Sequence, residues 1–316
     1  MIPLRAILRL RSPLGTPLAG DTLFGQLCHA CREMHGEDIL DNLLDGYGNV
    51  RPWLVVSDGF PGGYLPRPTA PAALQTACND VEERKTAKGR RWIPHEKIGL
   101  PLRQLLDAAV SDEDAYGKQS RPVQAAVFHN TLNRLTGTTG AGVFAPYTQP
   151  QIFHQTGQRI DLWLLLDEAR LARTDLHQLL EHVGSFGYGR DASIGLGKFE
   201  IESIEETTLF KQAHPQSNAF WTLAPCAPQG QGFDATRSYW RALTRFGRHG
   251  STLARGTNPF KRPLLLAGTG AVLTPRHAHP EQLFIGSGLT GISAAHEKTL
   301  HQGYALALGI YVEEFA

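Results

Sequence analysis

The first ten residues alternate with a period of two. One side of the alternation carries Ile2, Leu4, Ala6, Leu8 and Leu10, and the other carries Arg5, Ile7, Arg9 and Arg11. This period predicts a strand with one buried and one exposed face, so a second layer must cover one side of the sheet. Arg5 and Arg9 are candidate contacts for an anionic partner. The alternative is an ordinary strand face in solvent.

Helical spacing follows this strand. Asp21 or Thr22 would cap a helix that ends at Gly36 and whose apolar positions are Leu23, Phe24, Leu27, Cys31 and Met34. A short helix over 37–44 and a strand over 53–57 come next. Strand, helix and strand in this order are typical of a split βαβ, ferredoxin-like unit.

The remaining elements continue a mixed α+β pattern. A dense apolar strand over 160–166 precedes a helix that starts at Thr174-Asp175 and runs through Val183, and a strand over 198–204 follows. The polar segment 205–217 is the candidate domain boundary. Beyond it we expect a strand over 219–223, a helix over 236–246, a strand or hairpin over 264–273 and a strand over 304–312.

Composition limits the class of protein. The chain has 31 Lys and Arg against 30 Asp and Glu, a net charge of +1, and 41% hydrophobic residues. These values exclude a simple nucleic-acid coat protein and a disordered chain, and 316 residues suggest about two domains. The longest apolar stretch, 303–312, is about half of what a spanning helix needs. Four cysteines form no disulfide framework, so we expect a cytoplasmic protein with no membrane contact.

Two segments concentrate positive charge. Segment 84–97 has a local charge of +5 and contains Trp92, which suits an arm contacting a polyanion; its basic residues are Arg84, Lys85, Lys88, Arg90, Arg91 and Lys97. Segment 237–262 carries +7 with no Asp or Glu, and four of its arginines would form one helical stripe: Arg237, Arg241, Arg245 and Arg248. The alternatives are a solvated charge run and a helix face paired to acids elsewhere.

A glycine-rich loop spans residues 184–197. Five glycines in this loop would let backbone N–H groups approach phosphate oxygens, with Arg190 and Lys198 supplying charge. Its G-x-G-x-x-A pattern follows a helix and precedes a strand, which excludes a dinucleotide site, and Phe199 stands where a P-loop needs Ser or Thr. The alternative is a tight helix-to-strand connection.

Signatures of catalysis and of cofactor binding are weak. Cys28 and Cys31 form a lone CxxC, which is too few ligands for zinc, and His277 and His279 alone do not define an acid–base pair. We therefore expect no metal, no cofactor and no catalytic residue. A metal-independent endoribonuclease and a nucleotide enzyme using the glycine-rich loop stay open as alternatives.

Four motifs together resemble one known family. Gly20-Asp21-Thr22-Leu23-Phe24-Gly25-Gln26-Leu27, and then Ser57-Asp58-Gly59-Phe60-Pro61 with Leu65-Pro66-Arg67-Pro68, resemble the N-terminal signature of subunit four of the type III-A CRISPR Csm complex. The segment 130–137, Asn130-Thr131-Leu132-Asn133-Arg134-Leu135-Thr136-Gly137, is similar to that family's middle motif. The loop 187–200 resembles the glycine-rich loop of the RAMP superfamily.

The resemblance implies an architecture. It implies two ferredoxin-like (RRM-related) domains, 1–208 and 209–316, with an inserted thumb-like arm within about 69–150 and a glycine-rich loop. The segment 84–97 would correspond to the thumb-like hairpin.

The resemblance also implies a function and partners. Such a subunit is non-catalytic, caps the single-stranded 5′ handle of the CRISPR RNA, and contacts the large polymerase-like subunit and a backbone RAMP subunit. The equivalent subunit of a type III-B complex is a further alternative. The candidate RNA contacts are Arg5, Arg9, Asp21, Thr22, Arg84, Lys85, Lys88, Arg90, Arg91, Trp92, Asn130, Arg134, Thr136, Gly187, Gly189, Arg190, Ser193, Gly195, Gly197, Lys198, Arg245 and Arg248.

Overall fold

A four-stranded antiparallel sheet forms the N-terminal half of the computed structural model, which describes all residues except 72–73, 75–85, 88, 251–257, 278–281 and 314–316. The strands lie in the order β2-β7-β1-β8. They are β1 (Ile2–Leu10), β2 (Leu54–Pro61), β7 (Arg159–Leu166) and β8 (Phe199–Glu206). The predicted strands at 2–10, 53–57, 160–166 and 198–204 are therefore confirmed, with small shifts at their ends.

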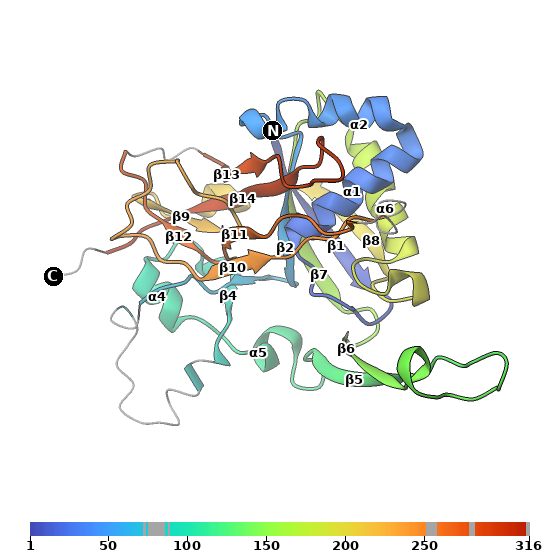
Figure 1. Cartoon of the computed structure of the whole chain (residues 1–316). Helices are drawn as coiled ribbons and strands as arrows, with labels where there is room; N and C mark the ends of the chain where they lie inside the picture. The colour runs from blue at the N-terminus through green and yellow to red at the C-terminus, as the bar shows by residue number, and fades with distance from the viewer. Residues whose placement is uncertain (72–73, 75–85, 88, 251–257, 278–281, 314–316) are drawn as a thin grey trace.

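Helices cover one face of this sheet (Figure 1). Helix α1 (Gly20–His35) packs on β2, α6 (Arg173–Phe186) packs on β8, and the short α2 (Glu37–Leu44) packs on α1. The three predicted helices in this half are confirmed. Their predicted caps are wrong, because the residues that precede α1 and α6 are Ala19 and Ala172, neither of which provides a side-chain cap. Among the described residues, no helix is long and apolar enough to cross a membrane.

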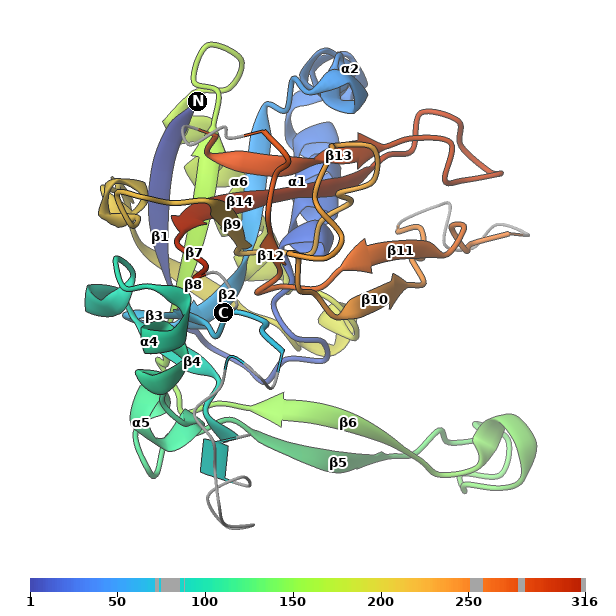
Figure 2. The same ribbon diagram turned by 90° about the vertical axis from the view of Figure 1, so that its left-hand side faces the viewer.

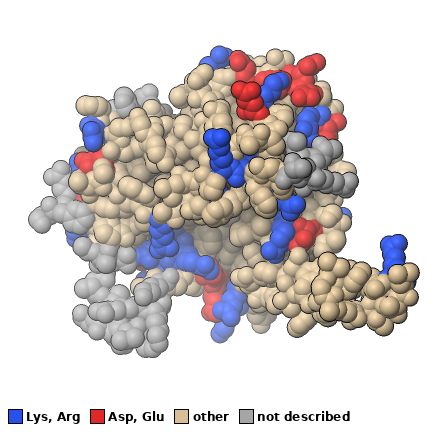
Figure 3. Space-filling model, in the orientation of Figure 1, with Lys and Arg blue, Asp and Glu red and all other residues tan. Residues whose placement is uncertain are grey.

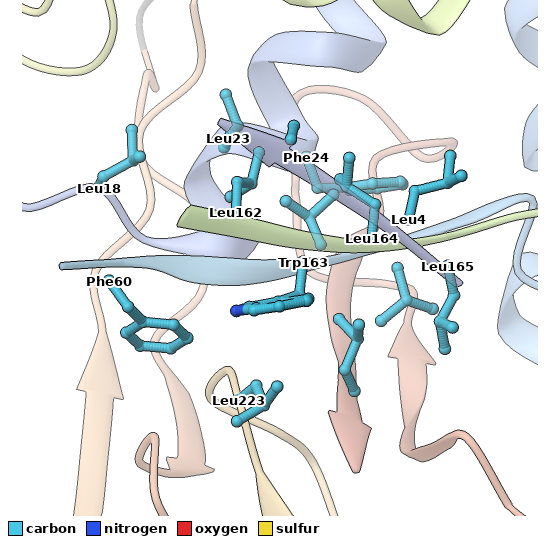
Figure 4. Close-up of a cluster of buried hydrophobic side chains, with 14 of the residues drawn as sticks. Leu4, Leu18, Leu23, Phe24, Phe60, Leu162, Trp163, Leu164, Leu165 and Leu223 are labelled. Carbon is cyan, nitrogen blue, oxygen red and sulfur yellow. The ribbon is translucent and has the colours of Figure 1, made fainter. Parts of the chain in front are cut away.

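Strand β7 is buried on both faces, as its apolar run predicts. In Figure 4, Leu162 and Leu164 point to the side of α1, while Trp163 and Leu165 point to the opposite side, toward Leu223. This alternation is the period-two geometry of a strand between two layers. The sheet is therefore the middle layer of the molecule.

A second four-stranded antiparallel sheet packs on that opposite side. Its order is β12-β9-β14-β13, and its strands are β9 (Ala219–Thr222), β12 (Val272–Leu273), β13 (Phe284–Leu289) and β14 (His301–Ile310). Strand β14 packs against β2 and β7. Trp221 and Leu306 of this sheet belong to the same buried cluster as Trp163. The expected strands at 219–223 and 304–312 are confirmed.

The expected helix over 236–246 is wrong. The structure has strand β10 (Ala242–Arg245) there, paired with β11 (Leu264–Ala267), which is the expected strand at 264–273. Arg237, Arg241, Arg245 and Arg248 therefore form no helical stripe.

The described part of residues 62–158 adds a short strand pair, a long hairpin and two short helices. Strand β3 (Tyr64–Pro66) pairs with β4 (Trp92–Pro94), and α4 (Leu102–Asp107) and α5 (Asp112–Tyr116) follow. Strands β5 (Val123–His129) and β6 (Tyr147–Phe153) pair in a long hairpin that extends away from both sheets in Figures 1 and 2. Segment 84–97 is described only in part, with β4 in its second half, so the thumb-like hairpin expected there stays a prediction. Single 3-10 turns are η1 (Tyr47–Asn49), η3 (His95–Lys97), η4 (Gly142–Phe144), η5 (Ala192–Ile194) and η6 (Leu209–Gln212).

Candidate nucleic-acid interface

The glycine-rich loop lies against the segment that leads into α1. A Cβ atom on Gly189 would lie 2.0 Å from Oγ1 of Thr16, and one on Gly197 would lie 2.0 Å from the carbonyl oxygen of Tyr188. Both glycines also have positive φ, at 77° and 74°. They are needed for close packing within the chain itself. Gly187 is enclosed in the same way, against the carbonyl oxygen of Leu196.

Most backbone donors of this loop are already used. The N–H of Gly189 donates to Oε1 of Gln26 at 3.2 Å, and that of Gly197 donates to the carbonyl oxygen of Pro13 at 2.8 Å. By contrast, the N–H groups of residues 191–193 donate to no group within the described residues. Ser193 is exposed, and nothing lies within 4 Å of where a Cβ on Gly195 would be. The accessible part of the loop is the turn 191–195.

Tyr188 fixes the loop to the start of α1. Its side chain is fully buried, its hydroxyl donates to the carbonyl oxygen of Pro17 at 2.9 Å, and it accepts the N–H of Ala19 at 2.9 Å. Burial raises the pKa of this hydroxyl, so Tyr188 stays neutral. Sequence reasoning missed this residue, because the backbone groups that its hydroxyl hydrogen-bonds lie about 170 positions away in the chain.

Arg190 connects the loop to the β5–β6 hairpin. Its guanidinium pairs with Asp191 at 3.1 Å and also donates to the carbonyl oxygen of Pro150, in the middle of β6. The side chain is exposed, as is that of Lys198. The two predicted cations of the loop therefore both face solvent, and one of them, Arg190, also contacts the β5–β6 hairpin.

Asp21 is buried, not an exposed cap. Arg245 forms an ion pair with it, with Nε of the arginine 2.6 Å from Oδ2 of Asp21, and Nε2 of His301 lies 3.4 Å from the same oxygen. Burial alone would raise the pKa of Asp21, but His301 and Arg245 hold it below its usual value. Thr22, the next residue, is exposed.

A second buried carboxylate, Asp58, completes this cluster. It accepts the N–H of Gly20 at 2.8 Å and the hydroxyl of Thr269. Burial, with help from nearby Asp21, raises the pKa of Asp58 to about 7. The cluster fastens β10 and the turn after β11 to the first turn of α1. Periodicity could not reveal it, because its members come from five separate parts of the chain.

The arginines of β1 have partners within the chain. Arg5 pairs with the buried Asp161 at 2.8 Å, and Arg9 pairs with Glu202 at 2.7 Å. Both acids lie on the neighbouring strands β7 and β8. Contact with an external anion stays a prediction for these two residues.

The basic segment 84–97 is only partly described. Arg84, Lys85 and Lys88 lie outside the described residues. Arg90 is exposed, Arg91 pairs with Asp112, and Nε1 of Trp92 donates to the same carboxylate at 2.7 Å. Trp92 also packs edge-on against Phe60 and Tyr116, so its ring stabilises the β3–β4 region.

The β5–β6 hairpin, including the turn 130–146, carries three predicted contacts, Asn130, Arg134 and Thr136, and all three are exposed. Arg134 is the one Lys, Arg, Asp or Glu residue between positions 122 and 158. Figure 3 shows the corresponding arm in tan with one basic side chain near its end. Exposed apolar side chains cover much of the rest, among them Phe128, Leu132, Leu135 and Val143.

The last two predicted contacts lie on β10 and the segment after it. Arg245 points inward to Asp21, whereas Arg248 is exposed, with its guanidinium 5.8 Å from the centre of the Phe260 ring. The structure thus brings Thr22, the turn 191–195, the β5–β6 hairpin and β10 around the start of α1. Among the described residues, no group of three or more His, Cys, Asp or Glu side chains is placed to hold a metal ion.

Comparison with known proteins yields structural matches alone. No protein-family profile and no curated protein sequence matches the chain. A chain in the crystal structure of a Csm1-Csm4 cassette in complex with pppApA matches at a TM-score of 0.61 and 17% identity, over 99% of this chain and 100% of that one. A Csm1-Csm4 cassette in complex with cA3 matches at 0.59 and 18%, with the same coverage.

A third match extends this comparison. A chain in the crystal structure of a Csm3-Csm4 subcomplex in the type III-A CRISPR-Cas interference complex matches at a TM-score of 0.57 and 13% identity, over 98% of this chain and 99% of that one. Csm4 is the subunit that all three structures share. At these identities the likeness establishes the fold, which is Csm4-like from end to end.

Proposed function

We propose that the chain is the Csm4-type subunit of a type III-A CRISPR-Cas effector complex. It would be a cytoplasmic, non-catalytic subunit that holds the single-stranded 5′ handle of the CRISPR RNA and links the large polymerase-like subunit to the backbone RAMP subunits. One observation carries this proposal: the fold corresponds to chains of Csm4-containing structures over the whole length of both partners.

Two RRM-related units fit this role. The first, residues 1–208, would be a ferredoxin-like domain. The element order β1-α1-β2-β7-α6-β8 and the strand order β2-β7-β1-β8 support this, because a ferredoxin-like domain has a βαββαβ plan. The second, residues 209–316, would be a reduced unit that keeps a four-stranded antiparallel sheet. We place its start in the polar segment after β8.

The turn 191–195 is the proposed phosphate contact. Its three N–H groups without a partner among the described residues lie beside Arg190, and successive N–H groups of this kind suit phosphate oxygens. The tightly packed glycines behind the turn would hold it in place. The exposed Thr22, at the start of α1, would supply a further contact on the same side of the molecule.

The β5–β6 hairpin is the proposed thumb, in place of segment 84–97. An arm with one cation and many exposed apolar side chains is poorly suited to gripping a row of phosphates. It is better suited to contacts with bases or with an apolar protein surface, and Arg190 would hold the hairpin next to the phosphate contact.

Co-purification tests the proposed function. A tagged chain is expressed with the other type III-A subunits and a CRISPR array, and the attached proteins and RNAs are identified. We expect the large subunit, the backbone subunit and a set of RNAs that share one 5′ end. A chain that purifies alone, or with RNAs of unrelated 5′ ends, would contradict the proposal.

The Arg190→Ala variant tests the phosphate contact. We expect this variant to bind the guide RNA more weakly. The slope of log K against log salt concentration should also fall in magnitude by about one unit, because one charge contact is lost. Lys211→Ala, which removes an exposed cation on η6, is the matched control and should leave the slope unchanged. Full guide binding by Arg190→Ala at every salt concentration would show that the loop does not contact RNA.

A further inference from the structure

The hairpin built on β10 and β11 has two distinct faces. Along residues 242–249, exposed side chains alternate with half-buried or buried ones. The strand pairing continues beyond β10 through a bridge between Arg248 and Phe260. We call the exposed side the outer hairpin face; its members are Ala242, Thr244, Phe246, Arg248, Phe260, Arg262 and Leu265. All seven are exposed, whereas Leu243, Arg245, Gly247 and His249, which alternate with four of them, are half-buried or buried.

The inner side fixes this hairpin to the body of the protein. Arg245 holds the start of α1 through Asp21, and Nε2 of His249 lies 2.7 Å from Oγ of Ser293. The outer hairpin face is therefore presented by a supported element, which lowers the entropy lost when a ligand binds.

Two aromatic rings dominate the outer hairpin face. Phe246 is 76% exposed and Phe260 is 61% exposed. Lys261 donates its N–H to the carbonyl oxygen of Gly247, which places the two rings on neighbouring strands as diagonal neighbours, with Cα atoms roughly 7–8 Å apart. Exposed rings at such a spacing are a cost in water that a stacking partner would relieve.

Charge identifies the class of partner. Residues 237–262 contain no Asp or Glu, and Arg248 and Arg262 lie on the same face as the two rings. Basic residues that cluster on one face are the electrostatic footprint of a polyanion-binding surface. Exposed rings interleaved with arginines match single-stranded nucleic acid, whose bases stack while its phosphates meet cations.

We propose that the outer hairpin face binds single-stranded RNA, with Phe246 and Phe260 stacking on unpaired bases and Arg248 and Arg262 meeting the adjacent phosphates. This inference rests on the proposed RNA-binding function and adds to it a surface separate from the glycine-rich loop. The sequence pattern pointed to Arg245 and Arg248; the structure assigns Arg245 to internal support and the rings to the ligand.

Fluorescence anisotropy of the full chain with a fluorescein-labelled, unstructured 20-nucleotide RNA tests this surface. We expect Phe246→Ala and Phe260→Ala each to weaken binding about tenfold, the usual loss for one stacked base. Phe246→Trp should bind as the unmodified chain does, and Phe246→Leu should lose as much as alanine, because leucine keeps apolar area but cannot stack. Circular dichroism confirms that each variant is folded.

Two further comparisons separate base stacking from charge contacts. Arg248→Gln and Arg262→Gln should each reduce the salt slope by about one unit, whereas the phenylalanine variants should leave it unchanged. Ile39→Ala, an exposed apolar residue on α2, is the control and should not alter binding. Leu265→Ala, on the same face, should have little effect.

The outcomes distinguish this inference from the proposed function. If Phe246→Leu or the alanine variants bind RNA as tightly as the unmodified chain, the stacking surface is refuted while RNA binding itself stands. If those variants instead lose co-purifying subunits and keep RNA, the face is a protein-docking surface and the inference is again wrong. If the unmodified chain binds no RNA and recruits no subunits, the proposed function fails together with it.

Discussion

Two neighbouring buried carboxylates, Asp21 and Asp58, have pKa values shifted in opposite directions, because their neighbours differ. Asp21 has Arg245 and His301 beside it, so its pKa falls, whereas the described residues offer Asp58 only neutral donors at hydrogen-bonding distance and burial raises its pKa to about 7. At neutral pH the pair therefore carries less than two negative charges. This difference matters because the cluster joins the first turn of α1 to β10, on which the outer hairpin face depends.

Asp58 predicts a pH dependence of stability. Its folded pKa of about 7 exceeds the unfolded value of roughly 3.9, so its stabilising effect is present below about pH 4 and is lost as the pH rises through 7. Relative to Asp58→Asn, the unmodified chain should lose roughly 2–4 kcal/mol of unfolding free energy between pH 4 and pH 8. Urea titrations at several pH values measure this difference. Because Asp21 is present in both proteins, its own loss of stability at low pH cancels, and a difference that stays flat would contradict the assignment.

Among the secondary-structure elements, the strongest local patterns were predictable. Strand β1 and helix α1 each carry many repeats of one period, and β7 is a continuous apolar run, so local sequence determines them. The sequence predicts a helix in place of strand β10, because arginines recur there at helical spacing, at Arg237, Arg241, Arg245 and Arg248. The same segment also alternates with a period of two, and pairing with β11, about 20 residues away, decides between the two periods.

For the candidate site, the sequence predicts the segments but not the ion pairs within them. The glycine-rich loop and the basic segment after residue 237 were found from composition, but the internal roles of Asp21, Arg5 and Arg9 were not. Each of these ion pairs joins residues at least 150 positions apart. The exposed hairpin β5–β6 was also missed, because its mixed, uncharged sequence has no clear period.

The β5–β6 hairpin should be separable from the rest of the fold. His129 and Tyr147 face each other across it, so replacing residues 130–146 with Asn-Gly closes a two-residue turn at the existing register. Most of the removed side chains are exposed, so the melting temperature should change by only a few degrees, while guide binding in the assembled complex should fall. A large loss of thermal stability would mean that the tip packs on the body. Unchanged guide binding would mean that the hairpin is not a thumb.

In the molecule as a whole, the two sheets share one core. Trp163 of the first sheet and Trp221 of the second belong to a single buried cluster, although the sequence predicts that the two sheets lie in separate domains. Near-neutral net charge fits this arrangement, because the cations gather on particular surfaces and many have acidic partners inside the chain. The two halves should therefore depend on each other for stability.

This shared core predicts one cooperative unfolding transition. Far-UV circular dichroism, which follows the sheets, and near-UV circular dichroism, which follows the buried tryptophans, should give coincident melting curves. Trp221→Ala should lower both midpoints together, since removing a buried tryptophan costs about 3–5 kcal/mol. Two separate transitions, with Trp221→Ala shifting one of them, would show that residues 209–316 unfold on their own.

The sparsely charged β5–β6 hairpin also has a consequence for the newly made chain. Within the described part of the chain its strands pair only with each other along most of their length, so their outer edges and several apolar side chains are exposed until a partner covers them. Unprotected edges of this kind invite pairing with other copies. We expect the orphan chain to aggregate or to be degraded soon after synthesis, and to persist when its partners are made alongside it. The arm would thereby help to match the cellular supply of this chain to that of its assembly.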